Sequence, residues 1–283
     1  MKTKFGMEEN SLKKKYTFNW QGAGALILGM IGGSLIVAFI NVIALFLFKV
    51  NLQYEDFYLL LANAAGFLGA IFAFDYFIVR PQTHRKLNFN FSPTNLMTYL
   101  LIFPMMFGMM LIAEFITSLI PISGPFFGEY YQYFSEMMEK MTKDKATLIF
   151  LAVIMAPIFE EIVFRGIIQK GLINKGVNPW TSIFIASVVF GVVHGNPWQL
   201  VGAILLGFVL GMVYHKTKSL LLPILLHAFN NLVSALLIFY GNTENFADTF
   251  KVSEVLLLGL GIILFGTTYY LFMKKYRVHY AEN

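Results

Sequence analysis

Three short polar blocks interrupt the hydrophobic sequence, and each carries side chains able to transfer protons or donate hydrogen bonds. They are Glu160-Glu161-Ile162-Val163-Phe164-Arg165, Phe190-Gly191-Val192-Val193-His194 and His227-Ala228-Phe229-Asn230-Asn231. A charged group at the centre of a bilayer costs at least about 2.5–3.5 kcal/mol, so such groups persist mainly where they face a polar cavity and serve a function. Carboxylate, imidazole and amide groups together inside a membrane favour hydrolytic chemistry.

The first block separates two neighbouring glutamates by their positions around a helix. Glu161 and Arg165 are four residues apart, with the acid on the N-terminal side, which is the favourable order for an ion pair. Glu160 points about 100° away, and its neighbours at i+3 and i+4 are apolar. We therefore expect Glu161 to be ionised and structural, and the poorly solvated Glu160 to act as a general base. The plainer alternative is that both acids merely pair with Arg165.

The other two blocks also place paired side chains one helical turn apart. Phe190 and His194 share a helix face, so the aromatic ring can pack against the imidazole and fix its orientation. A single histidine in a membrane is, however, more often an interhelical hydrogen-bonding residue. His227 and Asn231 share a face in the same way and can both donate to one small target, such as the oxyanion of a tetrahedral intermediate. Asn230 is a further candidate amide, offset around the helix.

Pro157 precedes the two glutamates by about one helical turn. Because proline lacks a backbone N–H, it leaves one carbonyl of the preceding turn without its helical donor and tends to kink the helix. We therefore expect a free backbone carbonyl close to the polar site.

The elements that position these blocks are long apolar segments. The chain is 57% hydrophobic and 13% charged, against about 25% charged residues in an ordinary soluble domain. Eight apolar runs approach the roughly 20 residues that a helix needs to cross a bilayer. The sequence therefore predicts an all-α polytopic membrane protein, a bundle of eight transmembrane helices around a polar intramembrane cavity. The runs cover approximately residues 21–48, 57–79, 95–120, 146–169, 180–194, 198–214, 219–240 and 253–273.

Basic residues between these runs predict the orientation of the chain. Lysine and arginine are concentrated in the N-terminal tail, in the second, fourth and sixth connections and at the C-terminal end. Since cytoplasmic loops carry the excess of positive charge, both termini are expected in the cytoplasm. We expect a cytoplasmic tail over residues 1–19, a single eight-helix membrane domain over residues 20–275 with its catalytic core at about 145–240, and a C-terminal tail over residues 276–283.

Residues 126–142 differ from the apolar runs because aromatic and methionine residues are interleaved with acids. This spacing suits an amphipathic helix that lies on the outer membrane surface. A helix that caps the end of the bundle is the other interpretation of the same pattern.

Taken in order, EEIVFR, FGVVH and HAFNN resemble the pattern EExxxR, FxxxH and HxxxN of the CPBP family, the CAAX proteases and bacteriocin-processing enzymes. The resemblance covers about residues 145–240 by motif and the whole chain by its number of spans. It implies a glutamate-type intramembrane endopeptidase in which Glu160 and His194 activate a water for attack on a peptide carbonyl. By the same resemblance, His227 and Asn231 would form the oxyanion hole, and the ion pair of the first block would support the site.

The expected partners are a membrane-associated peptide or protein substrate and the lipid bilayer, and the substrate need not be prenylated. The net charge of +5 lies in loops and tails, so no nucleic-acid partner is expected. We expect no cofactor: the chain has no cysteine and no H-E-x-x-H helix, although glutamate and histidine are ordinary zinc ligands. The expected location is a bacterial plasma membrane, with multiple spans.

Two non-enzymatic interpretations use the same polar residues. A membrane scaffold or bacteriocin self-immunity protein would bind a peptide or a membrane partner through the cavity without cleaving it. A transporter also carries acids and histidines inside the membrane. The polar groups cluster in one half of this chain, however, and no internal repeat pairs the two halves.

Overall fold

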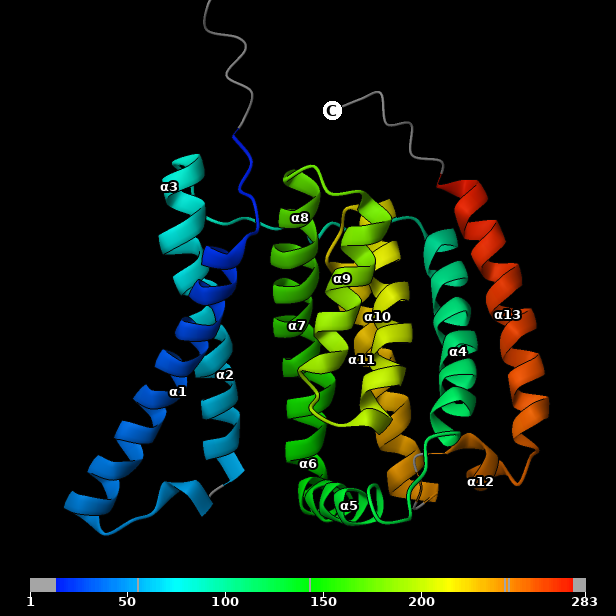
Figure 1. The fold of residues 1–283 in the computed structure, drawn as a ribbon, viewed down its shortest axis with the longest axis horizontal. Coiled ribbons are helices and arrows are strands. Elements are labelled where there is room, and N and C mark those ends of the chain that lie inside the picture. Colours follow the sequence, from blue (N-terminus) through cyan, green and yellow to red (C-terminus); the bar gives the residue numbers. More distant parts are fainter. Residues whose placement is uncertain (1–13, 55, 143, 242, 244, 277–283) are drawn as a thin grey trace, which may run out of the picture. The chain divides into compact units, whose positions relative to one another are not determined.

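The computed structural model of the protein describes residues 14–54, 56–142, 144–241, 243 and 245–276, so most of the predicted N-terminal tail and all but Tyr276 of the C-terminal tail lie outside it. Every regular element among these described residues is a helix (Figure 1). The helices belong to two compact units. Unit 1 comprises residues 1–88 and 170–177, and unit 2 comprises residues 89–169 and 178–283.

Unit 1 is built on two long apolar helices that approach each other closely through small residues. A Cβ atom placed on Gly33 would lie 1.9 Å from the carbonyl oxygen of Ala65, and one placed on Gly29 would lie 2.4 Å from that of Gly69. Only glycine therefore permits this backbone contact, as in other small-residue contacts between membrane helices. The helices of unit 1 are α1 (Trp20–Phe48), η1 (Leu52–Tyr54), α2 (Asp56–Phe74), η2 (Asp75–Val79), α3 (Arg80–Thr83) and α8 (Lys170–Asn174).

Unit 2 carries all three polar blocks. A buried apolar cluster joins four of its helices and includes Met105, Leu210, Leu226 and Phe272. Its helices are α4 (Leu96–Ser118), α5 (Gly128–Thr142), α6 (Lys145–Leu148), η3 (Ile149–Met155), α7 (Ala156–Glu161), η4 (Ile162–Gln169), α9 (Pro179–Val192), α10 (Pro197–Thr217), α11 (Leu221–Leu236), η5 (Leu237–Gly241), α12 (Phe246–Phe250) and α13 (Glu254–Lys275).

The helix that bears the glutamates alternates between two helical geometries. Its segments η3 and η4 are π-helical, with backbone bonds from residue i to residue i−5, and α7 between them is α-helical. Such π-helical stretches are rare and frequently lie at functional sites. The short α-helical turn therefore presents Glu160 and Glu161 between two widened segments of one continuous helix.

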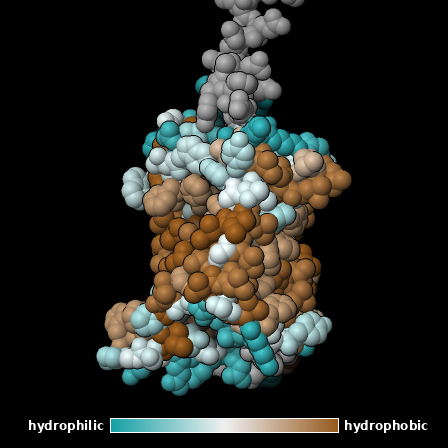
Figure 2. Space-filling model, turned by 90° about the vertical axis from the view of Figure 1, so that its right-hand side faces the viewer, coloured by the Kyte–Doolittle hydropathy of each residue, from teal (hydrophilic) through white to brown (hydrophobic). Residues whose placement is uncertain are grey.

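Seven helices among the described residues are long and apolar enough to cross a membrane, which fits a multi-pass membrane protein. The predicted run at 180–194 corresponds to α9, which has only 14 residues. At about 1.5 Å per residue it is roughly 21 Å long, short of the roughly 30 Å of bilayer hydrocarbon. Figure 2 shows, on one face, a hydrophobic central band with hydrophilic residues gathered at both ends.

Helix α5 accounts for the amphipathic pattern at residues 126–142. Figure 1 shows it running crosswise below α6 in that view. Phe134 on its inner side is buried, whereas Tyr133 is 67% exposed. One side of this amphipathic helix therefore packs on the bundle, and its location on the outer membrane surface stays a prediction.

Candidate active site

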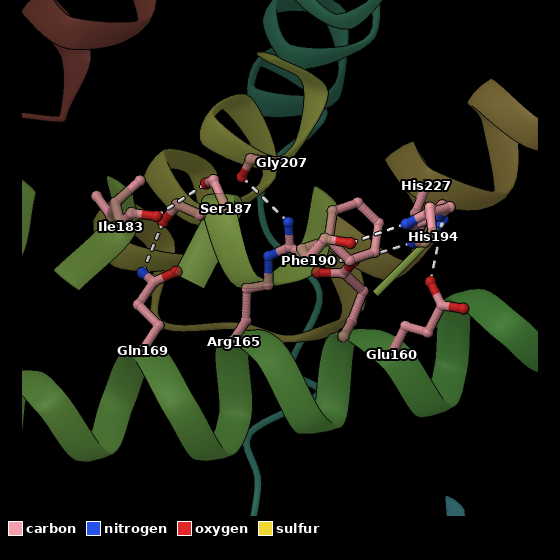
Figure 3. Close-up of polar contacts among 11 residues, drawn as sticks. Glu160, Arg165, Gln169, Ile183, Ser187, Phe190, His194, Gly207 and His227 are labelled. Carbon is pink, nitrogen blue, oxygen red and sulfur yellow. Dashed lines mark hydrogen bonds and ion pairs between the residues drawn. The ribbon is translucent and has the colours of Figure 1, made fainter. Parts of the chain in front are cut away.

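The centre of the site is a fully buried ion pair on the glutamate-bearing helix. Arg165 Nη1 donates to Glu161 Oε1 at 2.6 Å, and both side chains are 0% exposed. Arg165 Nη2 donates to the backbone carbonyl of Gly207 on α10 at 3.1 Å (Figure 3). The ion pair expected from the spacing of these two residues is therefore present, and its cation also donates to a neighbouring helix.

His227 on α11 bridges the two neighbouring acids. Its Nδ1 atom lies 2.9 Å from Glu161 Oε1, and its Nε2 atom lies 3.8 Å from Glu160 Oε2. The Glu160 side chain is 19% exposed, in contrast to the fully enclosed carboxylate of Glu161. Arg165 thus pairs with Glu161, while Glu160 faces the histidine, which contradicts the plainer interpretation that both acids merely pair with the arginine.

Phe190 on α9 is the common contact of three polar groups. The guanidinium carbon of Arg165 lies 4.7 Å from the centre of its ring. The imidazoles of His194 and His227 lie 5.0 Å and 5.5 Å from the same centre, nearly perpendicular to it, at 82° and 87°. One buried aromatic ring therefore fixes the orientation of both histidines and of the arginine (Figure 3).

A backbone contact determines which nitrogen of His194 is available for chemistry. Its Nδ1 atom lies 2.8 Å from the carbonyl oxygen of Phe190. A carbonyl oxygen only accepts hydrogen bonds, so Nδ1 carries the proton in this contact. In the neutral ring the Nε2 atom is then the acceptor, and it is the atom able to take a proton from a water.

A second polar contact, one turn further along the helix, was not predicted from the sequence. The fully buried Gln169 donates from Nε2 to the carbonyl of Gly211 at 2.8 Å. This bond repeats the contact of Arg165 with Gly207, because each pair is separated by 42 residues. The signal in the sequence is a glutamine four residues after the arginine, matched by two glycines four residues apart. Together the two bonds fix the register of η4 against α10.

Asn231 lies one turn beyond His227 and is engaged by the glutamate-bearing helix. Its Nδ2 atom donates to the backbone carbonyl of Ala152 at 2.7 Å. Its Oδ1 atom accepts a hydrogen bond from Asn230 Nδ2 at 2.9 Å. The structure therefore places both His227 and Asn231 against the glutamate-bearing helix. His227 contacts the carboxylate of Glu161, and Asn231 contacts the carbonyl of Ala152.

The loop that follows α9 holds His194 at the end of the bundle. The side chain of Asn196 donates to the carbonyl of His194 at 3.1 Å and accepts from the backbone N–H of Gln199 at 2.8 Å. The Tyr130 hydroxyl on α5 donates to the carbonyl of Gly195. Rings from residues 127–134 surround Trp198, with centroid separations of 4.9 Å for Tyr131 and 5.6 Å for Phe134. Helix α5 thus packs against the loop beside His194 and holds it in place.

These contacts leave one acid and one imidazole nitrogen facing each other. The 3.8 Å between Glu160 Oε2 and His227 Nε2 exceeds a direct hydrogen bond and falls within the distance of an ion pair. A carboxylate can accept a proton from a water, and an imidazole N–H can donate to a negative charge that develops on its target. Among the described parts of the chain, no group of three or more histidine, cysteine, aspartate or glutamate side chains is placed to hold a metal ion.

The apolar helices of unit 2 enclose a glutamate beside an imidazole. Residues 142–233, which include all three polar blocks, match the family described as type II CAAX prenyl endopeptidase Rce1-like. This segment is a domain of that family, and the family is one of peptidases that act on protein substrates. Neither the curated proteins nor the solved structures include a match to the chain.

Proposed function

We propose that this protein is a glutamate-type intramembrane endopeptidase that hydrolyses a peptide bond in a membrane-associated peptide or protein. The observation that carries the proposal is the arrangement around His227. A fully buried carboxylate holds one of its nitrogens, and the partly accessible Glu160 faces the other. The peptidase family of residues 142–233 supports the same assignment.

In the proposed reaction, Glu160 and the Nε2 atom of His194 hold and activate a water molecule. Glu160 takes a proton from the water, and the resulting hydroxide attacks the carbonyl carbon of the substrate. The carbonyl π electrons move to the oxygen, which becomes the oxyanion of a tetrahedral intermediate. When the C–N bond breaks, the protonated Glu160 gives its proton to the leaving amine, so protons and charges balance.

The oxyanion is assigned to His227 and Asn231. His227 donates from Nε2 while its Nδ1–H remains bound to Glu161, so the ring acts as an imidazolium. An amide nitrogen has two N–H groups, and Asn231 directs one of them to Ala152. The second N–H is the proposed donor to the oxyanion. Glu161 and Arg165 act by holding the His227 ring and by linking this helix to α10.

We further propose that α9 serves as an eighth span, so that the bundle encloses a polar cavity and both termini lie in the cytoplasm of a bacterial cell. The excess of lysine and arginine in the even connections supports this orientation. A short helix and the loop at residues 195–197 would let α9 and α10 meet below the outer surface. His194 would then lie within the membrane and still near its outer boundary.

The test compares the peptide termini of membrane and secreted fractions from cells that express the wild type or Glu160→Ala at matched levels. Termini that appear with the wild type alone would establish the activity and locate the cleaved bond. Glu136→Ala is the matched control, because it removes an exposed acid on α5 outside the site. Identical termini for all three proteins, with a cellular phenotype that Glu160→Ala still rescues, would contradict the peptidase assignment and favour a scaffold or self-immunity protein.

A further inference from the structure

Pro157 leaves one identifiable carbonyl without its helical donor. In the π-helical segment η3, each backbone N–H points to the carbonyl five residues earlier, and the last such bond runs from Ala156 to Leu151. The next donor in this register is residue 157, whose partner is the carbonyl of Ala152. Because proline has no N–H, the helix itself cannot complete this bond.

The orphaned carbonyl is the one that Asn231 contacts. Asn231 Nδ2 donates to Ala152 O at 2.7 Å, a bond between residues 79 positions apart in the chain. The neighbouring Asn230 donates to Asn231 Oδ1, so the amide is turned with its nitrogen towards the helix. A side chain of α11 therefore replaces the backbone donor that Pro157 removes.

The bond of Asn231 to Ala152 and the contact of His227 with Glu161 lie on opposite sides of the turn between Pro157 and Glu160. Along the glutamate-bearing helix, Ala152 precedes Pro157 and Glu161 follows it. Along α11, their partners Asn231 and His227 are one turn apart and in the reverse order. The two hydrogen bonds therefore lie on either side of the turn that carries Glu160 and hold it against α11 at both ends.

We propose that Asn231 is a positioning residue that closes the break made by Pro157 and thereby sets the placement of Glu160 opposite His227. This role is separate from a donation to the oxyanion, since it uses a different N–H of the same amide. Its catalytic consequence rests on the proposed function. Its structural basis does not, because the bond to Ala152 exists whatever reaction the protein performs.

Pro157→Ala provides the test, because alanine at this position supplies the missing N–H to the carbonyl of Ala152. Wild type, Asn231→Ala, Pro157→Ala and the double variant are purified in detergent and their thermal midpoints compared. Asn231→Ala should lower the midpoint by about 5 °C in the wild type. In the Pro157→Ala protein the loss should fall by half or more, since the backbone now satisfies the carbonyl. Equal losses in the two proteins would overturn the proposed bond.

Ser234→Ala is the matched control, since Ser234 lies nearly one turn beyond Asn231 on the same helix. Its effect on the midpoint should be the same with and without Pro157→Ala. Hydrogen exchange gives a second readout: the new amide at position 157 should exchange slowly when Asn231 is replaced, because it is then the donor to Ala152.

The catalytic part is tested by the cleavage rate on a peptide that spans the bond located by the terminal comparison. Asn231→Ala should lower kcat about tenfold more in the wild type than in Pro157→Ala, with KM changed little. Asn231→Ala could lower the midpoint less in Pro157→Ala than in the wild type and yet lower kcat equally in both. That result would limit Asn231 to a structural contact and overturn its positioning role. If no peptide terminus depends on Glu160, the proposed function fails. The comparison of thermal midpoints still tests whether Asn231 replaces the donor that Pro157 removes.

Discussion

His227 and Glu161 are joined through the Nδ1 atom of the imidazole, which lies 2.9 Å from Oε1 of the carboxylate. The same oxygen accepts a hydrogen bond from Arg165 Nη1 at 2.6 Å. Because this carboxylate is fully buried and shared between two donors, it holds the histidine ring with its Nε2 atom towards Glu160. The acid next to the proposed base therefore sets the geometry in which the base works.

Replacement of the two acids should separate stability from catalysis. Glu161→Gln removes the charge that faces a fully buried arginine, and loss of one partner of a buried ion pair typically costs about 3–5 kcal/mol. Glu160→Gln changes a partly exposed side chain, so the thermal midpoint should move little while cleavage is lost. Thermal unfolding in detergent and analysis of peptide termini measure the two effects. A Glu161→Gln protein as stable as the wild type would contradict the structural role.

Gly211→Ala should weaken the contact between η4 and α10. A Cβ atom at this position would lie 2.8 Å from Gln169 Oε1 and 2.9 Å from Ile183 Cγ2, so both side chains must shift. Overpacking of this kind typically costs about 1–3 kcal/mol. Gly202→Ala on the same helix is the control, since its Cβ would meet only Thr117 Oγ1, at 3.8 Å. Equal midpoints for the two variants in thermal unfolding would show that the register does not depend on Gly211.

Contacts within one helix could be predicted from the sequence because helical spacing determines them. The ion pair of Glu161 with Arg165 and the packing of Phe190 on His194 both follow from residues four apart. The apolar runs also predicted the all-helical architecture. The run at 180–194 also predicted a short helix, and α9 ends two residues before the end of that run because Val193 and His194 lie in the turn that follows.

Contacts between helices required the structure. The sequence placed His227 in an oxyanion site, but it gave no indication that the ring also contacts Glu161, 66 residues away. Pro157 predicted a free carbonyl near the site, yet only the π-helical register identifies it as that of Ala152. Gln169 was missed because a buried glutamine has meaning only when the carbonyl opposite it is known.

Trp198 should couple α5 to the loop that carries His194. Its ring is 8% exposed and stacks on Phe134 at 5.6 Å. Truncation of a buried tryptophan to alanine typically costs about 3–5 kcal/mol. Trp198→Ala should therefore speed amide exchange in residues 128–142 and 194–197 and lower the cleavage rate, whereas Trp198→Phe should retain most of both properties.

Trp20→Ala is the control for this effect, because Trp20 is 92% exposed. It should leave exchange in the two segments of unit 2 unchanged. Exchange in Trp198→Ala at the wild-type rate, measured by mass spectrometry of proteolytic fragments, would show that the aromatic cluster does not hold the loop.

Phe190→Leu should affect catalysis more than stability. Leucine fills most of the volume of phenylalanine, so this replacement should cost clearly less than the about 3–5 kcal/mol of a truncation to alanine. The variant nevertheless removes the aromatic face that meets the guanidinium of Arg165 and both imidazoles. Because misplacement of catalytic groups by about 1 Å can cost about 100-fold in rate, kcat should fall by at least tenfold, whereas the thermal midpoint should fall by only a few degrees. Phe184→Leu, on the same helix but 56% exposed, should leave both quantities as they are. Equal kcat values for the two leucine variants would mean that the histidines keep their orientation without the ring of Phe190.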